Sequence, residues 1–241
     1  MFGRKLLIGL AVAAVIIVGY SATNVSFAKA KKTGTFKVKI ENIGSPDGIA
    51  TADGSKYPFA LSPGLFIVNH KRQWFFNEGE KASDGLELQA EDGNPEKLSR
   101  SLLTKVGSIY MGIFNAPVGS DKPGPLLPGN SYEFSFEGTE GMKLNLIAMY
   151  GQSNDLFYAP KAALDLFDDN GNALTGDITD KFLLWDAGTE VNQAPGIGDE
   201  QAPRQKMGNT GKAENGVVGL VKDGFTYPNT KDVLRVTISA Q

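Results

Sequence analysis

Short stretches in which apolar and polar residues alternate recur along this sequence of 241 residues. In residues 36–40 the apolar side chains of Phe36, Val38 and Ile40 are separated by lysines, as a strand with one buried face requires. Similar stretches lie at 132–136, 143–149 and 233–238, and more continuously apolar ones at 65–68, 163–167 and 182–185. The chain also has 29 Gly and 12 Pro to form turns, so it is predicted to be mainly β, as an antiparallel β-sandwich.

Two short helices are predicted between the strands. Ser83 can cap a helix that runs to about Glu91, and Asn94 followed by Pro95 is a typical start for a second one. We expect both helices to cover one face or one end of the sandwich.

A long loop is predicted at 188–228, where the sequence has little periodicity. Loops of this length in a compact domain are commonly either functional or disordered. Arg204 is expected to hold this loop in place by bonding several backbone carbonyls, in preference to a role in recognition.

The first 30 residues have the pattern of a secretory signal peptide. Arg4 and Lys5 precede an apolar run at 6–18, and Ala28-Lys29-Ala30 offers a cleavage site for removal of the segment. The run is shorter than the roughly 20 residues that span a bilayer, although an uncleaved anchor is the alternative. We therefore expect residues 1–30 to be a signal peptide and 31–241 to be a single β-sandwich domain, secreted or periplasmic, with bacterial-type export the easier interpretation.

The charge of the exported chain limits its partners. Without Arg4, Lys5 and Lys29 it has 21 basic and 27 acidic side chains, a net charge of −6. This charge argues against binding to nucleic acid or non-specifically to an anionic membrane, so no stable membrane insertion is expected after cleavage. The sequence has no cysteine, so stability must come from the core and from any bound metal.

Three carboxylates stand where apolar runs meet the Gly- and Asn-rich loops: Asp155, Asp186 and Glu190. Carboxylates that are buried together repel one another unless a cation or a proton neutralises them. A cluster of hard oxygen ligands in a chain with no Cys and one His favours a calcium ion over a transition metal. If these residues do not converge, they are ordinary strand-end and turn carboxylates.

Other candidate sites have simpler interpretations. Asp165 could be a fourth ligand, but its place in an apolar strand favours a solvent-facing position. Residues 168–172 lack the ligand spacing of an EF-hand loop and are interpreted as a hairpin turn. His70, the only histidine, is interpreted as a packed residue at a strand end, and Trp74-Phe75-Phe76 as core rather than an exposed aromatic patch.

Several segments of the chain together form a family pattern. They are residues 61–70, 82–86, 90–93, 112–115, 123–129, 152–157, 185–190, 201–205 and 223–228. In order and number they resemble the spondin N-terminal domain family, and most closely its bacterial members, over nearly all of residues 36–239. The animal members of that family are extracellular-matrix proteins.

The resemblance implies a sandwich similar to the calcium-binding sandwiches of synaptotagmin, with calcium bound at one end. The family's ligands, an Asp in a Ser-Pro-Asp stretch and both Asp residues of Asp-Ala-Gly-Thr-Asp, fall here on Asp155, Asp186 and Glu190. Asn154 replaces the Pro, which we expect to matter little. Glu190 replaces an Asp, so its ligation could be bidentate, water-mediated or absent.

These observations favour a secreted calcium-binding module for adhesion or binding at the cell surface or in a matrix, and not an enzyme, with an unidentified surface or matrix component as its partner. One alternative is a hydrolase of envelope polysaccharide that uses Asp155 and Asp186 as an acid/base pair. A structural envelope protein without a ligand is the other.

Overall fold

The computed structural model describes residues 30–70, 75–103 and 110–241, and most of these residues lie in or between antiparallel strands. The strands are β1 (Thr33–Asn42), β2 (Ile49–Ala50), β3 (Lys56–Tyr57), β4 (Leu61–Asn69), β5 (Tyr110–Phe114), β6 (Ser131–Thr139), β7 (Lys143–Tyr150), β8 (Leu156–Pro160), β9 (Leu164–Asp165), β10 (Gly176–Asp177), β11 (Phe182–Asp186), β12 (Gly219–Leu220) and β13 (Leu234–Ala240). The helices are α1 (Asp84–Glu91), α2 (Glu96–Leu103), α3 (Thr230–Val233) and the 3-10 turn η1 (Thr179–Lys181).

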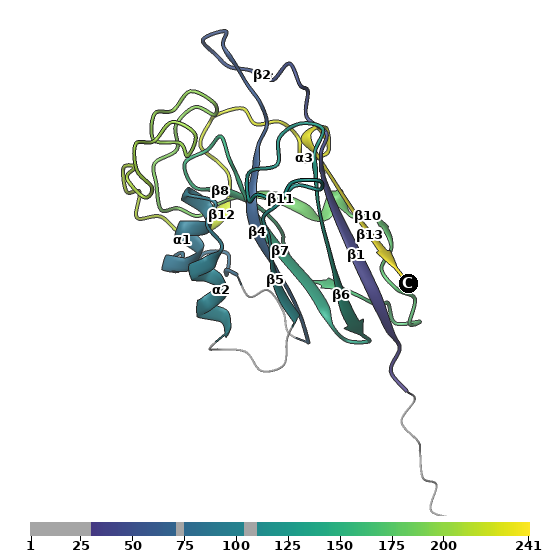
Figure 1. Cartoon of the computed structure of the whole chain (residues 1–241). Coiled ribbons are helices and arrows are strands. Elements are labelled where there is room, and N and C mark those ends of the chain that lie inside the picture. The colour runs from purple at the N-terminus through teal and green to yellow at the C-terminus, as the bar shows by residue number, and fades with distance from the viewer. Residues whose placement is uncertain (1–29, 71–74, 104–109) are drawn as a thin grey trace, which may run out of the picture. The chain divides into compact units, whose positions relative to one another are not determined.

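Two sheets form the predicted β-sandwich (Figure 1). The four-stranded sheet has the order β10-β13-β1-β6, and the seven-stranded sheet has the order β12-β11-β8-β7-β4-β5, with β9 paired to β7. The pairing of β1 with β6 and β13 is antiparallel throughout. A small hairpin, β2-β3, stands apart from both sheets.

The core between the sheets follows the alternation predicted for β1. Phe36, Val38 and Ile40 are each at most 1% exposed and belong to one apolar cluster. Phe66 and Phe134, from opposite sheets, stack within this cluster with their ring centroids 4.2 Å apart. Burial of each such side chain contributes roughly 1.5–3 kcal/mol to folding, so this cluster dominates the stability of the sandwich.

A second apolar cluster lies on the other face of the seven-stranded sheet, beneath α1 and α2. In β4 the side chains of Leu65 and Ile67 join this cluster, whereas those of Phe66 and Val68 join the first. The strand is therefore buried on both faces, which explains its continuous apolar sequence. Trp185 is fully buried in this second cluster, and its indole N–H donates to the carbonyl of Ala159 at 3.0 Å.

Both predicted helices are confirmed, together with the signals that start them. The Ser83 hydroxyl caps α1 by accepting from the Leu86 amide at 3.3 Å. The Asn94 side chain accepts from the Glu96 amide at 3.0 Å at the start of α2. The two helices pack closely because Gly85 has no side chain: a Cβ there would lie 2.8 Å from the Leu98 Cα.

Three smaller predictions concern the turn at 168–172, the aromatic residues at 74–76 and His70. Residues 168–172 form a tight turn in which the Asp168 amide donates to the Asn172 carbonyl at 2.9 Å. Phe75 and Phe76 are buried in the helix-covered cluster, while Trp74 lies outside the described residues. His70 follows β4 but is exposed, so its interpretation as a packed residue is wrong.

The predicted signal peptide at 1–30 lies, apart from Ala30, outside the described residues and stays a prediction. Residues Lys31–Gln241 hold their contacts among themselves as one unit. Among the described residues, no helix has the length and apolar character needed to cross a membrane.

Candidate metal centre

Asp155 occupies the tight connection between β7 and β8. Ser153 shapes this turn: its hydroxyl donates to the Tyr150 carbonyl at 2.6 Å and accepts from the Leu156 amide at 3.1 Å. The turn places Asp155, which is 0% exposed, directly before β8. One of its oxygens, Oδ2, accepts from the backbone N–H groups of Thr189 (2.7 Å) and Glu190 (3.1 Å) and from the Thr189 hydroxyl (3.1 Å).

Asp186 is the last residue of β11 and comes beside Asp155 because the two strands pair. In the β8–β11 register Asp186 lies opposite Leu156, the residue that follows Asp155. Its carboxylate is held from both sides: Oδ1 accepts from the Gly188 amide and Oδ2 from the Asn192 side-chain amide, each at 2.7 Å. Gly188 makes this turn possible, since its φ of +68° favours glycine.

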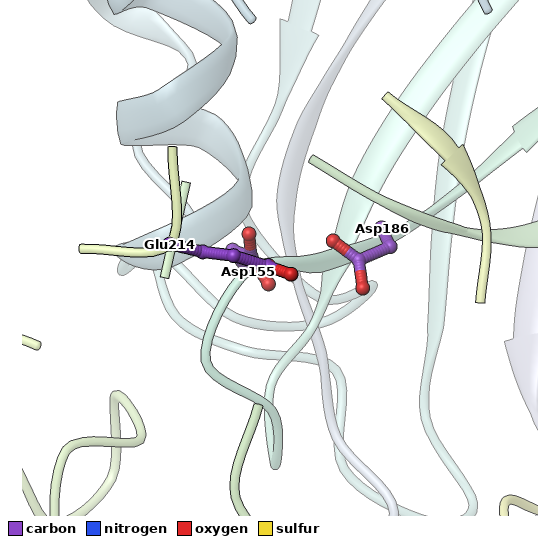
Figure 2. A group of neighbouring side chains, drawn as sticks. All are labelled: Asp155, Asp186 and Glu214. Carbon is purple, nitrogen blue, oxygen red and sulfur yellow. The ribbon is translucent and has the colours of Figure 1, made fainter. Parts of the chain in front are cut away.

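A third carboxylate, that of Glu214, completes the cluster (Figure 2). One oxygen from each of Asp155, Asp186 and Glu214 lies within 4.8 Å of the other two. The three residues are respectively buried, half-buried and exposed, so the cluster leads from the interior to the surface. The sequence prediction brought together Asp155 and Asp186 but missed Glu214.

Glu190 is not part of this cluster, although it was predicted as the third ligand. Its side chain is 3% exposed. Its Oε1 accepts from the Gly211 amide at 2.7 Å, and its Oε2 accepts from the Asn154 side-chain amide at 3.4 Å. The group of neighbouring carboxylates thus contains Glu214 and not Glu190.

Asp165 and Arg204, two further residues considered in the sequence, do not belong to the cluster. Asp165 is exposed and forms an ion pair with Lys143, at the opposite end of β7 from the cluster, so the solvent-facing interpretation is confirmed. Arg204 ties the long loop together: it donates to the Gly198 carbonyl at 2.8 Å and to the Gln152 side chain at 2.9 Å, and it also contacts the side-chain oxygen of Gln201.

Burial and mutual repulsion make the negative charges of the three carboxylates unfavourable unless a proton or a cation neutralises them. Burial, and after it the charge of Asp186, raises the pKa of Asp155 to about 7 in spite of its three hydrogen bonds. Burial also raises the pKa of Asp186. Partial desolvation and the charges of Asp186 and Asp223 raise that of Glu214. At neutral pH these groups are therefore stabilised by a proton or a cation between them.

One carboxylate oxygen of the cluster lacks a hydrogen-bond partner in the part of the chain that the structure describes. Asp155 Oδ1 is buried and has no hydrogen-bond partner among the described residues. A buried carboxylate oxygen without a partner costs roughly 1–3 kcal/mol or more, and a cation would remove that cost. The ligands are all hard oxygens, which fit calcium or magnesium better than zinc or copper. The residues present thus fit a hard divalent cation such as calcium or magnesium.

Glu91 is another buried acid close to this region that sequence reasoning missed. It is 2% exposed at the end of α1, and its Oε2 has no hydrogen-bond partner among the described residues. Burial raises its pKa to about 8, and the charges of Glu190, Glu87 and Asp155 add to that rise. The Glu91 carboxyl thus belongs to the same group of mutually repelling acids as Asp155.

Comparison with known proteins adds no relative: neither the protein-family models nor the curated proteins include a significant match.

Proposed function

We propose that this protein is an exported calcium-binding β-sandwich that acts as a binding or adhesion module. The observation that carries the proposal is the cluster of Asp155, Asp186 and Glu214, in which a fully buried carboxylate keeps one oxygen without a partner. The signal-like segment at 1–30 supports export. The resemblance to spondin N-terminal domains supports calcium and an adhesive role.

Calcium needs about six to eight oxygens at 2.3–2.6 Å. Three carboxylates provide at most about half of that number when each gives one oxygen, so backbone carbonyls, waters or a partner must give the rest. Glu214 is exposed, which leaves room on the solvent side of the cluster for such ligands.

Calorimetric titration of residues Lys31–Gln241 with calcium chloride tests the proposal. We expect a heat of binding and a higher melting temperature, because an ion bound only by the folded state adds roughly 2.7 kcal/mol at a hundredfold excess over Kd. Asp186→Asn should abolish both effects. Asp169→Asn, which removes an equal charge from the exposed turn at 168–172, is the matched control and should retain both.

The alternative of a polysaccharide hydrolase uses Asp155 and Asp186 as an acid/base pair. The raised pKa of Asp155 suits a general acid, but a side chain that is 0% exposed is poorly placed to reach a polymer. Turnover of a glycan library by the wild type, lost in Asp155→Asn, would favour the hydrolase. A structural protein without a ligand would show neither calcium binding nor turnover.

A further inference from the structure

We propose that Glu190 is a positioning residue of the cation site: its carboxylate fastens a short β-ribbon that carries Glu214 to Asp155 and Asp186. This inference rests on the proposed function and assigns to Glu190 a role different from the ligand role that the sequence predicts.

The ribbon joins two segments more than 20 residues apart in the long loop. The Val191 amide donates to the Lys212 carbonyl at 2.8 Å, and the Glu214 amide donates to the Thr189 carbonyl at 2.9 Å. A third bond, from the Gly216 amide to the Gly188 carbonyl at 2.7 Å, closes the ribbon. Glu214 thus owes its position beside the cluster to only a few backbone bonds.

The register sets which side chains face the cluster. Glu190 lies opposite Ala213 in an antiparallel bridge, so these two side chains share one face of the ribbon. Because successive side chains on a strand point to opposite faces, Glu214 lies on the other face. Accordingly, Glu214 belongs to the group with Asp155 and Asp186, and Glu190 does not.

The Glu190 carboxylate closes the far end of the ribbon. It accepts from the Gly211 amide at 2.7 Å, directly before the ribbon segment that carries Glu214. Asn154, which adjoins Asp155, contacts its other oxygen at 3.4 Å and accepts from the Gln193 amide at 3.0 Å. These bonds tie the ribbon to the same β7–β8 turn that holds Asp155.

The contact between Glu190 and the Gly211 amide requires a residue without a side chain at position 211. A Cβ on Gly211 would lie 2.0 Å from Glu190 Oε2, so any other residue would displace the carboxylate or the chain. A two-stranded ribbon is marginally stable on its own, and it therefore depends on such a fastening. Loss of the fastening should release Glu214, and with it part of the affinity for the cation.

Five variants of Lys31–Gln241, four single and one double, separate positioning from ligation when calcium affinity is measured by calorimetry. Glu190→Gln keeps an oxygen for the Gly211 amide and should bind calcium within about threefold of wild type. Glu190→Ala and Gly211→Ala remove the contact from either side, and each should weaken binding about tenfold, as loss of a supporting residue does. Their double variant should lose no more than either single variant. Glu214→Gln removes a ligand and should weaken binding at least as much.

Trypsin provides a readout that does not depend on calcium. Lys206 and Lys212 flank the Gly211 contact, so Glu190→Ala and Gly211→Ala should be cleaved there faster than wild type, and Glu190→Gln should not. Circular dichroism spectra like that of wild type would show that each variant folds.

The outcomes distinguish this inference from the proposed function. If the wild type binds calcium and Glu190→Gln loses as much affinity as Asp186→Asn, Glu190 is a ligand and the inference is overturned while the function stands. If the wild type binds no calcium, the proposed function fails, and so does the role of Glu190 at a cation site. If trypsin cleaves Glu190→Ala no faster than wild type, the claim that the Glu190 carboxylate stabilises the ribbon is also overturned.

Discussion

At the scale of single residues, Asp155 shows how a charge can be kept in a protein interior. Three donors from Thr189 and Glu190 satisfy Oδ2, while Oδ1 is buried without a hydrogen-bond partner among the described residues. The protein thus provides hydrogen-bond donors for one oxygen of the Asp155 carboxylate, and a cation would provide a partner for the other.

Asp155→Asn should have opposite effects with and without calcium. An amide keeps one oxygen for the Thr189 and Glu190 donors and places an N–H₂ beside Asp186, which removes repulsion. In chelator we expect the free energy of unfolding to rise by about 1–3 kcal/mol. Calcium should then add nothing. Chemical denaturation with and without chelator measures both effects, and a variant less stable than wild type in chelator would contradict this interpretation.

The same residues predict a dependence on pH. The pKa of Asp155 is raised from 3.8 to about 7 and that of Glu91 from 4.5 to about 8. Between those limits the folded state holds protons that the unfolded state has lost, so the stability of the metal-free protein falls as pH rises from about 4 to about 8. Each group contributes roughly 1.4 kcal/mol per pH unit across its own range.

Denaturant titrations in chelator at pH 5, 6.5 and 8 measure this slope. Calcium should reverse it, because the ion binds the ionised carboxylates, so affinity should rise from pH 5 to pH 8 with release of protons. Stability in chelator that stays constant or increases toward pH 8 would show that Asp155 and Glu91 are ionised without a metal.

The candidate site could be predicted only in part from its residues. Asp155 and Asp186 stand at strand ends, where alternation stops, and their pairing follows from neighbouring strands. Glu214 lies in a loop without periodicity, and a ribbon closed across more than 20 residues leaves no local signal. Asn154 was expected to matter little, yet its side-chain amide contacts the Glu190 carboxylate.

At the scale of elements, the helices and long strands could be predicted because each has a physical signal of its own. Ser83 and Asn94 cap their helices as expected, and β1 buries alternate residues. Among the two-residue strands, β2, β3, β10 and β12 are too short to show any period, and α3 is a single turn. Their positions are set by tertiary contacts, so sequence patterns did not reveal them.

The contact between α1 and α2 gives a prediction for Gly85→Ala. Alanine favours a helix by about 1 kcal/mol over glycine. The new Cβ would lie 2.8 Å from the Leu98 backbone, however, so the helices must separate. We expect a net loss of about 1–3 kcal/mol in the free energy of unfolding, measured by urea denaturation. Arg100→Ala, on the exposed face of α2, should change it by less than about 0.5 kcal/mol, and a stabilised Gly85→Ala would refute the close packing.

At the scale of the whole molecule, the seven-stranded sheet organises the protein. One face packs on the four-stranded sheet and the other on α1 and α2, while the β7–β8 turn and the end of β11 bring Asp155 and Asp186 together. The sandwich could be predicted from alternation, and the second apolar layer from the continuous apolar runs at 65–68 and 182–185 together with the helices expected to cover one face.

A binding module with a cation at this position should need the cation to hold its partner. Immobilised Lys31–Gln241 should retain cell-surface material in calcium and release it in chelator, and Asp186→Asn should retain little in either condition. Asp169→Asn provides the control. If wild type and both variants retain the same amount of material with and without chelator, partner binding does not depend on the carboxylate cluster.

A crystal structure of the protein grown in calcium, with the anomalous signal of the ion recorded, tests the carboxylate cluster most directly. We expect one ion within about 2.3–2.6 Å of oxygens from Asp155, Asp186 and Glu214, with Glu190 still bonded to Gly211. An empty cluster at millimolar calcium, or an ion held by Glu190 in place of Glu214, would contradict the assignment.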